Sequence, residues 1–217
     1  ETFTVVNPEG TLPQEKMKDE DGHELTLPRF YDHVLALDDV VDVDYFVPAC
    51  PPTPDMNMQI LGVVKEFVTK GTPLPPKGTV IASEKTLCDE CKRERAEKVS
   101  VDRLYRVHEK EFDQEKCFLD QGILCLGPAT RAGCGAVCTE TNMPCRGCMG
   151  PTAAVTEQGA SMLSALASVY GLTDRESELS EEEIDTLMSS ILDPLGCFYR
   201  FSLPKSQLGR VVTDTKG

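Results

Sequence analysis

The 217-residue chain has few positive charges and no long apolar segment. Its 22 Lys and Arg residues stand against 36 Asp and Glu residues, which gives a formal net charge of −14. A surface of that sign repels nucleic acid and anionic membranes, so we expect neither as a partner. A membrane-spanning helix needs about 18 or more consecutive apolar residues, and no such run is present, so we expect no membrane span.

The start of the sequence has no recognisable export signal. It begins at Glu1 rather than at Met, and neither a positively charged region nor an apolar signal region follows. We therefore interpret the sequence as a processed or incomplete form of the protein, with an earlier segment absent.

The first part of the chain, residues 1–72, has the pattern of an α/β domain. Residues 1–34 are polar and are expected to form a surface loop. Residues 38–50 alternate in the manner of a strand. A helix with apolar residues at helical spacing follows, and Gly71 stands just after its predicted end. Cys50 lies in the short loop between strand and helix, where ligands usually bind in α/β sheets.

A Pro- and Gly-rich stretch at residues 71–79 is the predicted domain boundary. We assign residues 73–217 to a second domain, which is loop-rich and partly helical. Charged helices are predicted near residues 89–97 and 101–114, and a packed helix is predicted over residues 159–171, closed by its final glycine.

The last predicted helix begins at a capping box formed by Ser180 and Glu183. In that motif each of the two side chains bonds to the backbone amide of the other residue. The apolar residues expected to be buried by this helix are Ile184, Leu187, Met188 and Ile191.

Cysteine is abundant and unevenly placed, because eight of the ten cysteines fall between residues 88 and 148. They form two groups of four, and each group contains one C-x2-C pair. The first cysteine set is Cys88, Cys91, Cys117 and Cys125. The second cysteine set is Cys134, Cys138, Cys145 and Cys148.

Three chemistries compete for so many thiols: disulfides, zinc and iron–sulfur clusters. Disulfides need an oxidising compartment, and no export signal points to one. A four-thiolate zinc site usually pairs two C-x2-C units, whereas each set here has only one. Clusters held by four cysteines tolerate uneven spacing, so the order of the cysteines favours iron–sulfur clusters. The glycines that would let backbone amides approach the sulfurs are Gly127, Gly133, Gly135, Gly147 and Gly150.

Four motifs resemble those of a known family. They are VDVDYFVPACPPTPD around Cys50, CLGPATRAGC from Cys125, MPCRGC before Met149, and DPLGCFYRFSLP near the end. In type and order they resemble the small subunit of nickel–iron hydrogenases. The resemblance is closest to the cytoplasmic group that delivers electrons to heterodisulfide reductase, the methyl-viologen-reducing and deazaflavin-non-reducing type. It extends from about residue 27 to about residue 203.

This resemblance implies a flavodoxin-like fold for the first domain, with only its C-terminal part present, and a row of clusters. By resemblance, Cys50 is one ligand of the proximal cluster, the first cysteine set holds the distal cluster, and the second holds the medial cluster. Periplasmic relatives carry histidine where Cys88 stands and proline where Cys138 stands. Both positions are cysteine here, which implies three 4Fe–4S clusters.

The sequence departs from the family's pattern at the proximal cluster. The family's N-terminal segment supplies three further cysteines to that cluster, and none of them is present here. We therefore expect that an N-terminal portion is missing. A smaller departure is Ala49, where the family more often has glycine.

The resemblance implies that the chain transfers electrons in the cytoplasm. A separate large subunit would hold the nickel–iron centre that splits hydrogen. Electrons would pass along the clusters to an iron–sulfur or flavin subunit, of the heterodisulfide reductase type. This chain has no catalytic residue of its own, and it has neither a dinucleotide fingerprint nor a phosphate loop, so the final acceptor is expected to bind elsewhere.

Two other functions compete with this interpretation. One is the small subunit of a nicotinamide- or deazaflavin-reducing hydrogenase. The other is a non-catalytic zinc-binding interaction module.

Four further residues have simpler interpretations. Cys197 is interpreted as a buried free thiol, because cysteine behaves as a small apolar residue. His108 lies in a charged segment and is interpreted as a surface residue. Arg131 and Arg146 lie in the cysteine-rich loops, where they either stabilise a reduced cluster or are simply solvated.

Overall fold

The computed structural model describes residues 9, 14–28, 34–97, 99, 101, 103–170 and 180–209. The chain separates into two compact units, Glu1–Val34 and Leu35–Gly217, and each is described by itself. Among the helices in the described ranges, none combines the length and the apolar character needed to cross a bilayer.

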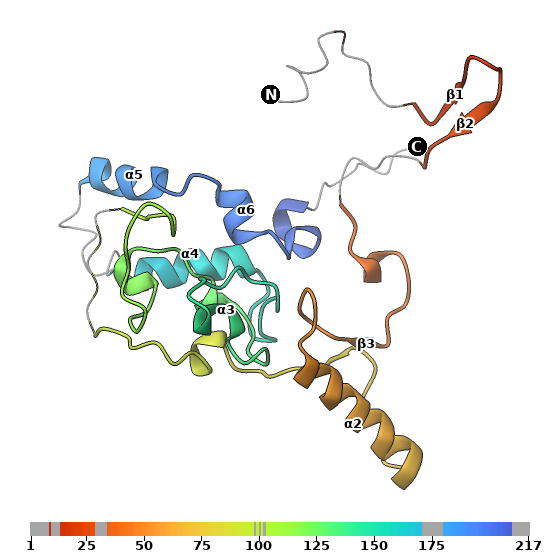
Figure 1. Ribbon diagram of the computed structural model, residues 1–217, viewed down its shortest axis with the longest axis horizontal. Coiled ribbons are helices and arrows are strands. Elements are labelled where there is room, and N and C mark those ends of the chain that lie inside the picture. The colour runs from red at the N-terminus through yellow and green to blue at the C-terminus, as the bar shows by residue number, and fades with distance from the viewer. Residues whose placement is uncertain are drawn as a thin grey trace. The chain divides into compact units, whose positions relative to one another are not determined.

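The first unit contains a short hairpin within the segment that the sequence predicts to be a loop. Strand β1, Lys16–Lys18, pairs antiparallel with β2, Glu24–Thr26 (Figure 1). The residues of both strands are exposed, so the predicted surface position is confirmed, but the predicted absence of regular structure is wrong. Gly22, at φ +84°, allows the tight connection between the strands.

The second unit begins with a strand–helix–strand arrangement (Figure 1). Strand β3, Tyr45–Phe46, pairs parallel with β4, Thr79–Val80, and helix α2, Pro54–Lys70, connects them. Two parallel strands joined through a helix are the repeating unit of α/β sheets. The flavodoxin-like fold itself stays a prediction, as does the boundary at residue 72, which falls between α2 and β4.

The strand predicted over residues 38–50 is much shorter in the structure. Leu37–Asp39 forms a 3-10 helix instead, in which the Asp39 carboxylate accepts a hydrogen bond from the Ala36 amide at 2.9 Å. Lys205 pairs with Asp38 at 3.0 Å. Aspartate side chains that bond to nearby backbone amides compete with strand pairing, and this explains why only β3 remains extended.

Helix α2 follows its sequence signals closely. The Thr53 side chain caps its N-terminus by accepting a hydrogen bond from the Met56 amide. As predicted, Gly71 ends the helix, in the left-handed conformation at φ +67°. Of this fully described helix, Met56 alone is buried. Leu61 is 58% exposed and Val68 is 72% exposed. The helix therefore has an apolar face that its own unit does not cover.

The core of the second unit lies among loops and short helices of the cysteine-rich region and the C-terminal part. Phe118, Leu119, Ile123 and Leu126 are almost fully buried there, together with Met162 of helix α4. The helices of this part are α3 Val137–Glu140, α4 Gln158–Val169, α5 Glu181–Ser189 and α6 Pro194–Phe198. Helix α4 packs against α6 and against the 3-10 turn Gly127–Ala129.

The two C-terminal helices predicted from the sequence are confirmed. At the start of α5 the Ser180 hydroxyl accepts a hydrogen bond from the Glu183 amide. The Glu183 carboxylate in turn accepts a hydrogen bond from the Ser180 amide at 2.9 Å. Leu187 and Ile191 are buried as expected, whereas Ile184 is half-buried and Met188 is 44% exposed. Helix α4 matches the predicted helix over 159–171, although Gly171, its predicted end, lies outside the described residues.

The predicted charged helices near residues 89–97 and 101–114 are wrong. Only the 3-10 turn Leu87–Asp89 forms there, and the described residues of both segments are otherwise irregular. Glu94 pairs with Lys116, and Tyr105 pairs with Ile123, through isolated parallel bridges. The second segment carries apolar residues at helical spacing, Val101, Leu104, Tyr105 and Phe112, but they pack on the core from an irregular backbone. Long-range backbone pairing determines the conformation of both segments and overrides local helix propensity.

Candidate metal centre

The first cysteine set lines a single cavity. Cys88, Cys91, Cys117 and Cys125 all contribute to its wall. Cys88 lies on the 3-10 turn Leu87–Asp89, and the Cys91 amide bonds to the Leu87 carbonyl at 3.0 Å. The Cys117 amide bonds to the Glu94 carbonyl at 2.7 Å. The fold thus brings four thiols from three separate segments to one place.

Burial dominates the chemistry of these thiols. It raises the pKa of Cys88 and of Cys125 to about 12, and it also raises the pKa of Cys117. Backbone amides act in the opposite direction: the Cys145 amide donates to the Cys125 sulfur at 3.2 Å. Amides that point at a sulfur stabilise its thiolate form, and in iron–sulfur proteins such bonds tune the reduction potential.

Gly127 lets the backbone approach two of these sulfurs closely. A Cβ atom at this position would lie 3.2 Å from the Cys88 Sγ and 3.7 Å from the Cys125 Sγ. A side chain here would therefore intrude on the cavity. This glycine has the role predicted for it, and Gly147 has a related one because its amide donates to the Cys145 sulfur at 3.4 Å.

Arg93, on the wall of the same cavity, joins segments around the first cysteine set, and no pattern in the sequence indicated this role. Its guanidinium donates to the carbonyl of Lys116 at 3.0 Å, to the carbonyl of Thr139 at 3.2 Å and to the Asn142 side chain at 2.6 Å. It also lies 4.0 Å from the centre of the Phe118 ring. These contacts join segments far apart in the sequence, so no local pattern could have indicated the role of this arginine.

Arg95 is a second arginine on the cavity wall. Its positive charge lowers the pKa of the Cys88 thiol, against the larger raising effect of burial. A cation in that position favours extra negative charge at the site.

The second cysteine set is less uniform. Cys145 is buried, Cys134 and Cys148 are half-buried, and Cys138 is exposed on α3. Burial raises the pKa of Cys145 to about 12, with a further contribution from repulsion by Cys125. Cys148 exerts the same kind of repulsion on Cys134 and on Cys145. Three of the four thiols therefore interact electrostatically, and the role of Cys138 as the fourth ligand stays a prediction.

The two remaining cysteines lie outside both sets. Cys50 is exposed in the loop between β3 and α2, as predicted, and is not part of the wall of the first cavity. The preceding Ala49 has φ +90°, a region that favours glycine, which is the residue that the resemblance implies for this position. Cys197, on α6, is half-buried and not, as predicted, fully buried.

The spacing of the donor atoms bears on the choice of metal. All ten cysteines are free, so no disulfide framework is formed. A tetrahedral zinc with Zn–S bonds of about 2.3 Å holds its sulfurs about 3.8 Å apart. Among the described residues, three donor atoms within 4.8 Å of one another occur at Asp19, Asp21 and His23, and not in either cysteine set. The cysteines are thus spread more widely than a single zinc ion requires, and a four-iron cluster accepts that wider spacing.

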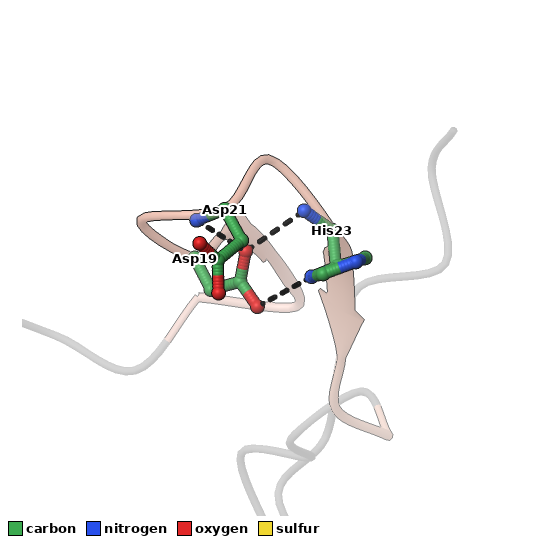
Figure 2. Close-up of side chains that lie close together, drawn as sticks. All are labelled: Asp19, Asp21 and His23. Carbon is green, nitrogen blue, oxygen red and sulfur yellow. Dashed lines mark hydrogen bonds and ion pairs between the residues drawn. The ribbon is translucent and has the colours of Figure 1, made fainter.

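The group of Asp19, Asp21 and His23 is explained by the hairpin turn (Figure 2). The Asp19 carboxylate accepts hydrogen bonds from the Asp21 amide at 3.0 Å, the His23 amide at 2.8 Å and the His23 Nδ1 at 3.0 Å. The backbone bond from His23 contributes most to lowering the pKa of Asp19. These bonds use the oxygens of Asp19 to shape the turn.

The arginines singled out from the sequence have different surroundings. Arg131 is buried and donates to the carbonyl of Ser83 at 3.0 Å and to Glu84 at 2.9 Å. It ties loops together, so the interpretation of Arg131 as a solvated residue is wrong. Arg146 is half-buried, and His108 is exposed as predicted.

Comparison with known proteins agrees with an iron–sulfur assignment. The chain is 38% identical to the iron–sulfur subunit of the F420-non-reducing hydrogenase of Archaeoglobus profundus, over 94% of this chain and 60% of that protein. It is 35% identical to the G subunit of the F420-non-reducing hydrogenase of Methanothermobacter marburgensis, over 94% and 59%. The equivalent protein of Methanothermus fervidus is 39% identical over 54% of this chain and 91% of its own length. The chain belongs to the family of F420-non-reducing hydrogenase G subunits. No family model matches it.

Membership of this family associates the chain with hydrogenases, and the name of the Archaeoglobus relative, an iron–sulfur subunit, is consistent with the ten cysteines. The chain spans about 60% of the length of the Archaeoglobus and Methanothermobacter relatives. Its four-thiol cavity, with a glycine against two sulfurs and a backbone amide directed at one of them, suits a cluster held by cysteine.

Replacing Gly127 with alanine tests the fit of the first cavity. The added methyl group would lie 3.2 Å from the Cys88 sulfur, so either that sulfur or the backbone must shift. We expect the variant to lose iron from one site and to lose about 1–3 kcal/mol of stability, the usual cost of overpacking. The measurements are iron and sulfide content per chain and urea denaturation.

The matched control is Gly62→Ala, because Gly62 lies on α2 with no atom near its would-be Cβ. It should keep full iron content and gain up to about 1 kcal/mol from helix propensity. Full iron together with unchanged stability in the Gly127 variant would contradict the expectation that a glycine is required against these sulfurs.

Because of the buried thiols, we expect the stability of the metal-free chain to depend on pH, and we expect bound metal to remove this dependence. Folding raises the pKa of Cys88, Cys125 and Cys145 from 9.0 to about 12. A raised thiol pKa stabilises the metal-free fold fully below about pH 9, and this contribution is lost as the pH rises toward 12. Metal-bound sulfurs are already deprotonated, so the metal-bound chain should lack this loss.

The measurement is the urea midpoint of the metal-free and metal-bound chain at about pH 8 and about pH 10.5. Lysine and tyrosine titrate in both forms, so the difference between the forms reports on the thiols. An equal change in both forms would contradict the assignment of these cysteines as ligands.

Proposed function

We propose that this chain is the electron-transfer small subunit of a nickel–iron hydrogenase and that it carries 4Fe–4S clusters. The observation that carries the proposal is the convergence of Cys88, Cys91, Cys117 and Cys125 on one cavity. The family to which the chain belongs supports it. The nickel–iron centre would reside on a separate large subunit, and the location would be the cytoplasm.

The proposed ligands follow the two cysteine sets. The first cysteine set would hold the distal cluster, and the second would hold the medial cluster. Cys50 would supply one ligand to a proximal cluster, the third of the row. The position of Cys50, directly after β3 and before α2, supports this, because ligands bind at the carboxyl ends of strands in α/β sheets. A flavodoxin-like fold of the first domain is part of the proposal.

When bound, the clusters would accept and release single electrons between a hydrogen-oxidising centre and an acceptor subunit. The chain's residues would set the conditions for this chemistry. Burial of Cys125 and Cys145 excludes water from their sulfurs. The amides of Cys145 and Gly147 donate to sulfur, and Arg95 adds a positive charge beside Cys88. Each of these donors and charges favours the thiolate form and influences the potential.

The proposed acceptor is an iron–sulfur or flavin subunit of a heterodisulfide reductase complex. The relatives are named F420-non-reducing, and F420 is a deazaflavin, which counts against the alternative of a deazaflavin-reducing hydrogenase. A nicotinamide-reducing partner is the competing possibility. The experiment below distinguishes the two.

The test is purification of the complex under argon, with identification of every co-purifying chain. We expect brown protein with broad visible absorption, iron and sulfide in equal amounts, nickel in a larger subunit, and an iron–sulfur or flavin acceptor subunit. A nicotinamide-binding partner would replace the heterodisulfide reductase assignment. Colourless protein with stoichiometric zinc would overturn the proposal in favour of a zinc-binding interaction module.

Cys138 provides the sharpest test of the cluster type. It is the second residue of α3, where proline is tolerated in a helix, so Cys138→Pro should preserve the fold. We expect the variant complex to show an oxidised three-iron signal in electron paramagnetic resonance, absent from the unmodified complex, because one corner of the medial cluster has lost its ligand.

The control is Cys197→Ser, which removes a free thiol outside both cysteine sets and should leave every cluster signal unchanged. An unchanged four-iron spectrum and potential in the Cys138→Pro complex would remove Cys138 from the ligand set.

A further inference from the structure

A groove separate from the first cysteine cavity opens on the second unit. Its volume is about 680 Å³. Leu104, Ile123 and Ile191 contribute to its wall, and all three are buried. The groove therefore has an apolar floor formed by buried side chains.

Three arginines converge on the same groove: Arg106, Arg146 and Arg200. Arg106 and Arg200 are exposed, and Arg146 is half-buried. Burial raises the pKa of Cys197, which also lines the groove, and the charges of all three arginines oppose this effect. The three guanidinium groups are thus close enough to act on one sulfur.

These arginines form no ion pair among the described residues. The acid beside Arg106 is Glu109, whose carboxylate accepts a hydrogen bond from the Arg106 amide at 2.7 Å, and this bond does most to lower the pKa of Glu109. Arg200 donates only to the Gly196 carbonyl at 3.2 Å. Asp193 also lines the groove, but its carboxylate accepts the Gly196 amide at 2.9 Å and caps α6. His108, on the same wall, adds positive charge when it is protonated.

Such a cluster of like charge is unusual in a chain with a net charge of −14. Guanidinium groups repel one another, and an anion placed between them removes the repulsion. Their planar donors match carboxylates in paired hydrogen bonds. The apolar floor requires an apolar group as well, which a small inorganic ion lacks.

We propose that this groove docks an acidic segment of another subunit of the hydrogenase complex. An apolar side chain of that segment enters the floor, and neighbouring Asp or Glu carboxylates bind the arginines. This inference rests on the proposed function for the existence of a partner subunit. Because Arg146 directly follows Cys145, the docked segment would cover the loop of the second cysteine set.

The first experiment is arginine modification with phenylglyoxal, read by peptide mass, in the intact complex and in the chain separated from it by salt. We expect Arg106, Arg146 and Arg200 to be protected in the complex and reactive in the separated chain. Arg103 is exposed and does not line the groove, so it should react equally in both. Equal reactivity of the three groove arginines in both samples would overturn the proposal.

Charge reversal tests the affinity. Arg106→Glu and Arg200→Glu should each weaken the association with the partner about tenfold or more, with a reduced dependence on salt. The control is Lys18→Glu, which makes the same change in net charge on the exposed strand β1. An equal effect of all three variants would mean that net charge, and not the groove, controls association.

A photoreactive residue at Leu192, which is 64% exposed and lines the groove, identifies the occupant. The expected cross-linked peptide comes from another subunit and contains Asp or Glu beside an apolar residue. Protection that persists in the separated chain, or that inorganic phosphate alone reproduces, would overturn the proposal in favour of this chain's own residues or a free anion. Iron and sulfide content, measured on the same samples, reports on the proposed function independently of docking.

Discussion

The hydrogen bond from the Cys145 amide to the Cys125 sulfur connects the two cysteine sets, and much of the second unit depends on it. The two residues are 20 positions apart, both are buried, and the Leu126 amide returns a bond to the Cys145 carbonyl at 3.0 Å. A sulfur buried in this way loses its hydration, and the amide replaces part of it. The surrounding loops must therefore stay ordered for either sulfur to keep its environment.

Side chains, rather than long helices or sheets, provide that order. Arg93 bonds to two segments, at Lys116 and at Thr139 and Asn142, and Arg131 joins the loops around Ser83 and Pro151. Gln158, the first residue of α4, reaches both Thr130 and the Gly147 carbonyl at 3.3 Å. Backbone groups that have no helix or sheet partner are satisfied by these donors, which lets an irregular core remain buried.

The elements that depend on local signals could be predicted from the sequence. Thr53 and Gly71 define α2, and Ser180 with Glu183 defines the start of α5, because caps act over a few residues. The spacing of the cysteines also predicted that the first cysteine set forms one group, and the fold brings its four members to one cavity. The predicted helices near 89–97 and 101–114 failed because bridges to Lys116 and Ile123 are long-range. Arg93 was missed for the same reason, since its partners lie up to 49 positions away.

The uncovered apolar face of α2 determines what stability measurements on this chain can detect. Leu61 and Val68 are largely exposed, so replacing either with a polar residue removes little buried area from the second unit. Unfolding experiments would therefore classify these positions as free to vary. A role of this apolar face in contact with another surface would therefore leave no trace in the free energy of unfolding.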